Sequence, residues 1–276
     1  MIKQSVSIIM PVYNEDESIP SLYTELKAAL TNFPTHEIIF INDGSYDTSF
    51  DKISTLVDQD STVTLIDLYS NFGKADALNE GFKVATGNIV ITMDADLQDD
   101  PAEISNLVNK INEGWDVVSG WKVARQDPIT KRLPSKLFNA VMRYVTNLKI
   151  HDFNCGLKAY RYKVVKALDL YGGMHRYTPA LAAQKGFSVT EISVNHRSRQ
   201  FGVTKYGGSR IFHGFYDLLT VMFLGKYLSR PLHFFGSIGL VLLSSGLAIN
   251  VYLTVVGLMV YGLGIDRFSF WGYYYS

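Results

Sequence analysis

The sequence predicts an α/β domain built on a mostly parallel sheet with helices on both faces, followed by a membrane segment. Between Val6 and Trp121, short apolar runs alternate with amphipathic helical patterns, which is typical of such a sheet. Residues 231–265 form a run of 35 residues without Asp, Glu, Lys or Arg, and about 20 apolar residues suffice to cross a bilayer. We therefore expect a globular domain tethered to a membrane by a C-terminal helix.

Five strands are expected in the first half of the chain, because runs of β-branched and apolar residues recur there between turn-forming residues. They are predicted at residues 6–10, 37–42, 63–68, 88–93 and 116–121. Helices are expected after the first four strands, where apolar residues recur every three or four positions. Ser18 is expected to cap the first helix, whose apolar face holds Ile19, Leu22, Leu26 and Ala29.

Three polar loops, at residues 11–15, 42–47 and 94–99, should meet at the carboxyl edge of this sheet, where open α/β sheets bind ligands. In the third loop, Asp94, Asp96 and Gln98 are spaced so that their oxygens can converge on Mg²⁺ or Mn²⁺. A solvated acidic turn ahead of the helix near Pro101 is the alternative. The sequence has no G-x-G-x-x-G after the first strand and no Walker loop, which disfavours dinucleotide enzymes and P-loop NTPases.

The formal net charge of zero hides a strong segregation of charge along the chain. Residues 1–121 hold 6 Lys and Arg against 20 Asp and Glu, a net charge of −14, whereas residues 122–230 hold 19 against 5, a net charge of +14. This pattern predicts that the second part faces an anionic partner, either a membrane surface or a phosphorylated substrate. The long apolar run argues against nucleic acid. The single Cys155 excludes a disulfide within the chain and fits a reducing compartment.

The membrane segment sets the expected organisation and orientation of the chain. Lys226 and Arg230 stand directly before the apolar run, so the N-terminal domain should lie in the cytoplasm, and no signal peptide is recognised at the start of the chain. We expect a globular domain at residues 1–208, a juxtamembrane amphipathic helix along the interface at 209–230, and a transmembrane segment with a short tail at 231–276. A packed core helix is the alternative for residues 209–230.

Six segments in order resemble glycosyltransferase family 2, and within it the polyprenyl-phosphate glycosyltransferases that are similar to dolichol-phosphate mannose synthase. The matching segments are residues 11–15 (PVYNE), 42–47 (NDGSYD), 71–81 (NFGKADALNEG), 93–99 (MDADLQD), 151–161 (HDFNCGLKAYR) and 199–207 (RQFGVTKYG). Two positions depart from the family pattern, since Asn42 stands where Asp is usual and Ser70 where Arg is usual. The second departure removes a contact to the donor phosphates.

The resemblance implies a GT-A fold, a Rossmann-like architecture, and an inverting transfer of one hexose, glucose or mannose, from a UDP- or GDP-linked sugar to a polyprenyl phosphate. It also implies a role for each matched residue. Base and ribose would be held by Pro11, Tyr13, Glu15 and Asp43. The metal, and through it the donor diphosphate, would be held by Asp94, Asp96 and Gln98. The donor phosphates would also be reached by Arg199 and Lys205, and the acceptor phosphate by Lys122, Arg132 and Ser135.

The acceptor chemistry bears on whether a general base is needed. A phosphate monoester has a second pKa of about 6, so the acceptor is largely a dianion at neutral pH and needs little help from a base. Alignment and charge neutralisation are the larger tasks, and they suit a metal and several cations. Asp152 is the residue expected to act as base if one is used, and a turn residue bonded to its own backbone is the alternative.

Two other functions stay open from the sequence. A haloacid dehalogenase-like phosphatase also uses Asp-x-Asp after an apolar strand, with Asp94 as nucleophile in that case, although it normally places the motif on the first strand. A non-catalytic, membrane-tethered protein that binds a nucleotide sugar would fit if Ser70 marks lost activity. The sequence leaves open the donor sugar, the polyprenol and whether the chain forms a homo-oligomer.

Overall fold

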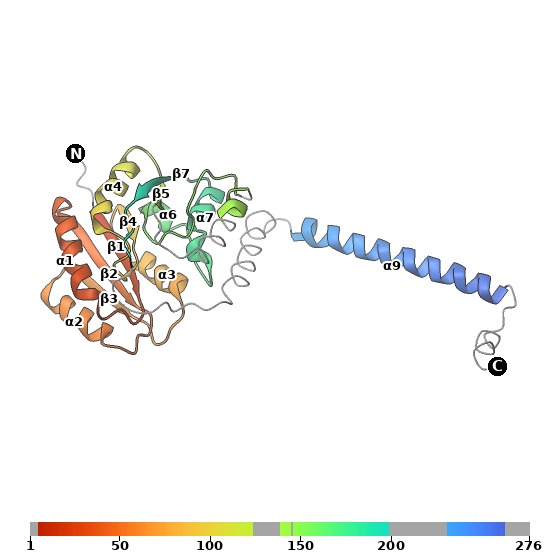
Figure 1. The fold of residues 1–276 in the computed structure, drawn as a ribbon, viewed down its shortest axis with the longest axis horizontal. Helices are drawn as coiled ribbons and strands as arrows, with labels where there is room; N and C mark the ends of the chain where they lie inside the picture. Colours follow the sequence, from red (N-terminus) through yellow and green to blue (C-terminus); the bar gives the residue numbers. More distant parts are fainter. Residues whose placement is uncertain (1–4, 124–138, 145, 199–230, 263–276) are drawn as a thin grey trace. The chain divides into compact units, whose positions relative to one another are not determined.

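The computed structural model describes residues 5–123, 139–144, 146–198 and 231–262 (Figure 1). These residues fall into two units, an α/β domain and one long C-terminal helix, which we describe separately. Residues 132, 135, 199 and 205, and the expected interfacial helix at 209–230, lie outside the described residues. The predicted domain boundaries at 208/209 and 230/231 therefore stay predictions.

The α/β domain is built on one seven-stranded sheet with the strand order β3-β2-β1-β4-β6-β5-β7. All neighbouring strands are parallel except the two pairs that involve β6, which runs antiparallel to β4 and β5. The predicted mostly parallel sheet is thus confirmed. The strands are β1 (Ser5–Val12), β2 (Thr35–Asn42), β3 (Val63–Asp67), β4 (Ile89–Thr92), β5 (Val117–Lys122), β6 (Lys158–Arg161) and β7 (Val189–Val194).

Helices cover both faces of this sheet, because alternate residues of each strand point to opposite faces. On one face, Ile8 of β1 and Phe40 of β2 share a core cluster with residues of α1 (Ile19–Ala29), α2 (Ser49–Gln59) and α4 (Ile104–Asn112). On the other face lies α3 (Lys74–Val84), where a Cβ added to Gly81 would come within 2.5 Å of Ile9 Cγ2. The arrangement places α1 and α3 on opposite sides of β1 (Figure 1).

The second half of the domain completes the sheet with an antiparallel insertion. Between β6 and β7 lie α6 (Tyr162–Val165), the 3-10 helix η3 (Met174–Arg176) and α7 (Thr178–Gln184). Shorter 3-10 turns occur at η1 (Leu30–Asn32) and η2 (Pro101–Glu103). Because β6 pairs with β4, the chain that leads into β6 lies beside the end of β4. This insertion brings residues 154–158 to the carboxyl edge of the parallel strands.

Ser18 is the N-cap residue of α1, as expected, but its side chain does not bond to the helix. Its buried hydroxyl instead donates to the carbonyl oxygen of Ala95 at 2.6 Å and to that of Glu15 at 2.8 Å. The hydroxyl therefore ties the start of α1 to the loop after β4, because a buried polar group must find a partner and this one finds it across the sheet edge.

The C-terminal unit is α9 (Pro231–Gly262), a helix of 32 residues. At about 1.5 Å per residue it measures roughly 48 Å, which is longer than the hydrocarbon core of a bilayer. Within it, Phe235–Met259 is long and apolar enough to cross a membrane, and none of that stretch is buried against protein. The predicted C-terminal membrane segment thus corresponds, in length and composition, to a single candidate spanning helix among the described residues.

Candidate functional site

The loop that follows β4 carries the acidic residues that the sequence singled out. Asp96 is buried, with 7% of its surface exposed, and its Oδ1 accepts a hydrogen bond from the backbone N–H of Gln98 at 3.1 Å. Leu97 adopts the left-handed conformation, with φ of 60°, which turns the chain sharply. Asp94, two residues after the end of β4, is half-buried. The loop thus folds back on itself and keeps both carboxylates at the carboxyl edge of the sheet.

Lys74 lies against the first of these carboxylates. It is the first residue of α3, and its Nζ pairs with Asp94 Oδ1. Burial alone would raise the pKa of Asp94, but the positive charges of Lys74 and Lys122 outweigh it and lower the pKa to about 2. Asp94 is therefore ionised at neutral pH and is held in a positive environment.

A second ion pair, between Lys122 and Asp99, contacts the start of the acidic loop. Lys122 Nζ, at the end of β5, lies 2.9 Å from Asp99 Oδ1; the Asp99 side chain is buried and that of Lys122 is 11% exposed. The other oxygen of Asp99 accepts from the backbone N–H of Asp94 at 3.3 Å. Burial alone would lower the pKa of Lys122, but the charges of Asp99 and Asp94 raise it above its usual range. In this structure Lys122 therefore holds Asp99, and Asp99 holds the start of the acidic loop.

The loops after β1 and β2 bond to each other. The backbone N–H of Asn14 donates to Ser45 Oγ at 2.9 Å, and that of Tyr46 donates to Asn14 Oδ1 at 2.9 Å. The rings of Tyr13 and Tyr46 meet edge to face at 6.1 Å. Three of the predicted nucleotide-binding residues lie along β1 and this loop and are half-buried: Pro11, Tyr13 and Glu15.

Asp43 joins the loop after β2 to the one after β3. It is 4% exposed, and its two oxygens accept hydrogen bonds from the backbone N–H groups of Phe72 at 2.8 Å and Gly73 at 3.0 Å. Burial raises the pKa of Asp43 against the effect of these hydrogen bonds. Since Gly73 precedes the first residue of α3, Asp43 also fixes the start of the helix that carries Lys74. The motif at 71–81 drew attention to this segment, but the sequence did not predict that its backbone would bond to Asp43.

Asp152 lies in the turn that leads toward β6. It is 2% exposed, and its Oδ1 accepts from the backbone N–H of Asn154 at 3.1 Å, which is the bond expected of a turn residue. The preceding His151 stacks on Trp121, with ring centroids 4.2 Å apart, and pairs with Glu191. The role of Asp152 as general base stays a prediction.

Two basic residues beneath the acidic loop were not predicted. Lys158, the first residue of β6, is 3% exposed, and burial together with the charge of Lys74 lowers its pKa to about 8. His175 also lines this region, and burial lowers its pKa well below the usual value. With Lys74, Thr92 and other residues they surround a cavity of about 10 Å³, which is room for roughly one water molecule. The sequence signal that could have predicted a buried lysine is the run from Leu157 to Tyr160, in which Lys158 stands among apolar residues.

A divalent cation such as Mg²⁺ or Mn²⁺ requires several oxygen ligands that converge on one point. Among the described residues, no group of three or more His, Cys, Asp and Glu side chains is arranged to hold a metal ion. Asp94 and Asp96 nevertheless fit Mg²⁺ or Mn²⁺ in kind, because both are carboxylates at a ligand-binding edge and Asp94 is ionised. In this structure the cation next to Asp94 is Lys74.

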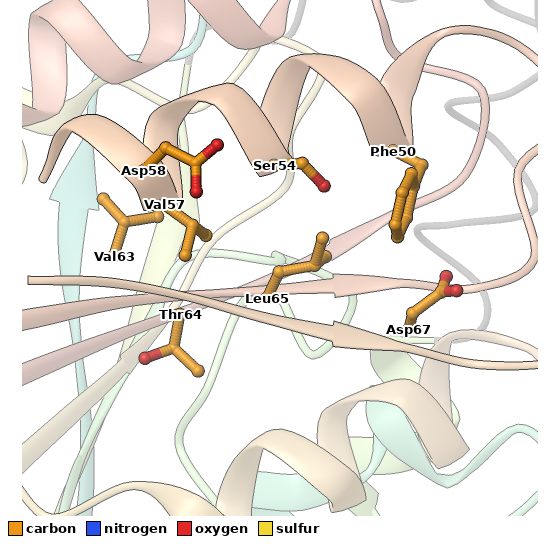
Figure 2. Close-up of a pocket in the computed structure, with 8 residues that line it drawn as sticks. All are labelled: Phe50, Ser54, Val57, Asp58, Val63, Thr64, Leu65 and Asp67. Carbon is orange, nitrogen blue, oxygen red and sulfur yellow. The ribbon is translucent and has the colours of Figure 1, made fainter. Parts of the chain in front are cut away.

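A larger hollow lies elsewhere, between α2 and the edge strand β3. It measures about 380 Å³, and Figure 2 shows Asp58 and Ser54 on the helix facing the strand, with Phe50 and Asp67 toward one end. Its charged lining consists of Asp58 and Asp67 and contains no Lys or Arg. Because it offers two negative charges, it is unsuited to a diphosphate, and we place the functional site at the Asp94 loop.

The chain resembles known proteins over most of its length. Residues 7–169 match the model of glycosyl transferase family 2. The chain is 36% identical over 269 residues to the dodecaprenyl-phosphate galacturonate synthase of Rhizobium johnstonii, covering 95% of this chain and 77% of the relative. It is 37% identical over 265 residues to the undecaprenyl-phosphate 4-deoxy-4-formamido-L-arabinose transferase of Shewanella sediminis, covering 95% and 78%.

Solved structures share the fold at lower identity. The glucosyl-3-phosphoglycerate synthase of Mycobacterium tuberculosis, in complex with Mn²⁺ and UDP-glucose, is 16% identical, with a TM-score of 0.63 over 80% of this chain and 79% of that one. A complex of that enzyme with phosphoglyceric acid is 15% identical, with a TM-score of 0.61 over 82% of this chain and 85% of that one. These similarities establish the GT-A-like fold predicted from the sequence.

Proposed function

The chain belongs to glycosyl transferase family 2, and from this premise we propose that it transfers a hexose, glucose or mannose, from a UDP- or GDP-linked sugar to a polyprenyl phosphate. The observation that carries the proposal is similarity along 95% of the chain to two enzymes named for polyprenyl-phosphate sugars. Transfer of a sugar to a polyprenyl phosphate is supported at this level. The sugars in their names are galacturonate and 4-deoxy-4-formamido-L-arabinose, so the donor is the part that needs a direct test.

We propose that Asp94, Asp96 and Gln98 hold Mg²⁺ or Mn²⁺. When bound, the metal would neutralise the diphosphate of the donor and favour its departure. A neighbour in fold was solved with Mn²⁺ and UDP-glucose, which supports a divalent metal in this architecture. The pKa of Asp94, lowered to about 2, keeps this carboxylate ionised at any physiological pH.

The donor nucleotide is assigned to the connected loops after β1 and β2. Base and ribose would contact Pro11, Tyr13, Glu15 and Asp43, which lie on or beside the loops that bond through Asn14 and Ser45. Rigid mutual bonding of the loops fits a preformed nucleotide surface. Arg199 and Lys205 are proposed to reach the donor phosphates.

The acceptor phosphate is assigned to the basic second half of the chain, with Lys122, Arg132 and Ser135 as its contacts. An oxygen of the polyprenyl phosphate attacks the anomeric carbon, the bond from that carbon to the nucleoside diphosphate breaks, and the configuration inverts. The acceptor is already a dianion, so no proton has to leave it first. What the protein supplies is alignment and positive charge around two phosphorylated molecules.

A lipid acceptor and the apolar helix α9 support a reaction at a membrane. We propose that α9 anchors the chain in the cell membrane and that the α/β domain faces the cytoplasm, because Lys226 and Arg230 precede the apolar run. The single Cys155 is buried, and burial raises its pKa to about 12, so it should not react. Tyr171→Cys, at an exposed position, should therefore react with a membrane-impermeant maleimide only after cells are opened.

The two alternatives from the sequence fit less well. A haloacid dehalogenase-like phosphatase would carry its nucleophile after the first strand, whereas Asp94 follows β4, and the family match is to glycosyltransferases. A non-catalytic protein would bind the nucleotide sugar but form no labelled lipid, whereas an enzyme would form it.

The test is a panel of radiolabelled nucleotide sugars, including UDP-glucose, GDP-mannose and UDP-galacturonate, incubated with the full chain, a C55 polyprenyl phosphate and Mn²⁺ or Mg²⁺. We expect one donor to give a solvent-extractable labelled lipid. Transfer from a donor other than a glucose or mannose nucleotide would overturn the choice of sugar and keep the reaction class. Absence of labelled lipid with every donor would overturn the proposed function.

A further inference from the structure

We propose that Lys74 is a built-in counter-ion of the metal site, which pairs with Asp94 when the site is empty and moves to a donor phosphate when metal and nucleotide bind. The inference rests on the proposed function, since it concerns the same carboxylate. The proposed exchange concerns the side chain of Lys74 alone. The observations that carry it are the pairing of Lys74 with Asp94, the anchoring of Lys74 and the backbone of Gly156 packed against Asp94.

The pairing itself is the first observation. Lys74 Nζ pairs with Asp94 Oδ1, and the two side chains are both half-buried, which strengthens their attraction relative to a pair in water. A divalent cation that binds Asp94 would bring two positive charges to the oxygens that Lys74 contacts. The ammonium and the metal would repel each other there, so both cannot occupy the same side of Asp94 at full strength.

The anchoring of Lys74 is the second observation. Its backbone follows Gly73, whose N–H donates to Asp43 Oδ2 at 3.0 Å, so the start of α3 is fixed. The side chain of a lysine, by contrast, has four rotatable methylene groups and a mobile point charge. Lys74 can therefore change partner by rotating its side chain while the helix stays in place.

The other side of Asp94 is closed to Lys74. A Cβ added to Gly156 would lie within 2.8 Å of all three carboxyl atoms of Asp94, so backbone fills that side. Beneath the loop, the buried ammonium of Lys158 lies close enough for Lys74 to lower its pKa. A displaced Lys74 is repelled by Lys158 and is therefore proposed to move toward the donor diphosphate.

The exchange has a signature that a purely structural lysine would not give. Removing the charge of Lys74 should tighten the binding of metal to Asp94, because a competitor is lost, and should weaken the binding of the nucleoside diphosphate, because a phosphate contact is lost. A variant that merely misfolds would weaken both. The two affinities are therefore expected to change in opposite directions.

The experiment measures Mn²⁺ affinity by electron paramagnetic resonance on the full chain in detergent, without nucleotide. Lys74→Met should bind Mn²⁺ roughly three to ten times more tightly than the wild type, a change on the order of one ion pair. Lys83→Met removes the same charge from the same helix, where Lys83 pairs with Glu80, and should stay within about twofold of the wild type. Lys74→Arg keeps the charge, and its Mn²⁺ affinity should also stay close to that of the wild type.

The second measurement is binding of UDP or GDP, whichever the wild type binds, at saturating Mn²⁺. We expect Lys74→Met to bind it about tenfold more weakly, in line with one lost charge-assisted contact. Unchanged Mn²⁺ affinity in Lys74→Met, with weaker Mn²⁺ binding in Asp94→Asn, would overturn the exchange and keep the metal site. Equal Mn²⁺ binding by wild type and Asp94→Asn would instead overturn the metal assignment itself, and the exchange with it.

Discussion

The backbone of Gly156 packs directly against the carboxylate of Asp94. A Cβ added at this glycine would lie 2.6 Å from Asp94 Oδ2 and 2.8 Å from Oδ1, closer than side-chain carbons approach other atoms. The carbonyl oxygen of Gly156 also accepts a hydrogen bond from Thr92 Oγ1 at 2.9 Å, at the end of β4. The backbone of Gly156 therefore helps to fix the orientation of the Asp94 carboxylate, although glycine contributes no functional group.

The first prediction concerns this contact. Gly156→Ala should displace the Asp94 carboxylate and lower the transfer rate about 100-fold, since a misplacement of about 1 Å in a site costs that much. Transfer to polyprenyl phosphate is measured with the best donor. Gly172→Asn is the matched control, because Gly172 has φ of 56°, which asparagine tolerates, and nothing lies within 4 Å of its Cβ position. Full activity in Gly156→Ala would refute the packing argument.

The second prediction concerns the structural role of Lys122. Lys122→Met leaves the buried Asp99 without its ion pair and should lower the free energy of unfolding by about 3–5 kcal/mol. The double variant Lys122→Met/Asp99→Asn should regain much of that loss, because the amide needs no counter-ion. Lys110→Met, which breaks a more exposed pair with Glu113, should cost less than about 1 kcal/mol. Denaturant unfolding in detergent compares these variants, and a small loss in Lys122→Met would argue that the pair is unimportant for the fold.

The third prediction follows from the pKa of Lys158, which is about 8 in the folded protein and 10.5 without perturbation. Between these values the unfolded chain binds the proton that the folded chain releases, so the stability of the fold rises with pH. The rise should reach about 3 kcal/mol between pH 7 and 11 and should be absent in Lys158→Met. The stability difference between wild type and variant is followed by denaturation across that range, and a difference independent of pH would contradict the burial of a charged Lys158.

The fourth prediction addresses Asp152. Asp152→Asn keeps an oxygen that can accept from the N–H of Asn154, and a phosphate dianion needs no base, so transfer should stay within about tenfold of the wild type. Asp152→Ala loses the turn bond and should be less stable. A general base contributes about 10²–10⁴-fold. A loss of that size in Asp152→Asn, with an unchanged melting temperature and an altered pH profile, would identify Asp152 as the base.

Much of the parallel half of the sheet was predictable, because its strands are continuous apolar runs that end in polar loops. β4 illustrates this, since Ile89–Thr92 is buried along its whole length and Asp94 follows two residues later. The convergence of the loops after β1, β2 and β4 followed from parallel pairing alone. The hydrogen bond between Asn14 and Ser45 agrees with that expectation.

The contacts that complete the site were beyond sequence reasoning, because they depend on tertiary pairing. β6 runs antiparallel between β4 and β5, and no local pattern announced that order. Gly156 therefore packs against Asp94 from more than sixty residues away in the chain. The side-chain partner of Ser18 was missed for the same reason, since its hydroxyl donates to the distant carbonyl oxygen of Ala95 instead of bonding to its own helix. The pairing of Lys74 with Asp94 likewise joins two motifs that were recognised separately.

The most direct test of the account is transfer of radiolabelled sugar to a C55 polyprenyl phosphate by Asp96→Ala, compared with the wild type at saturating Mn²⁺. Asp96 is buried in the loop that is proposed to hold the metal, so its removal should abolish the labelled lipid while circular dichroism and the melting temperature show an intact fold. Labelled lipid formed by Asp96→Ala at close to the wild-type rate would contradict the central claim that this acidic loop carries the reaction.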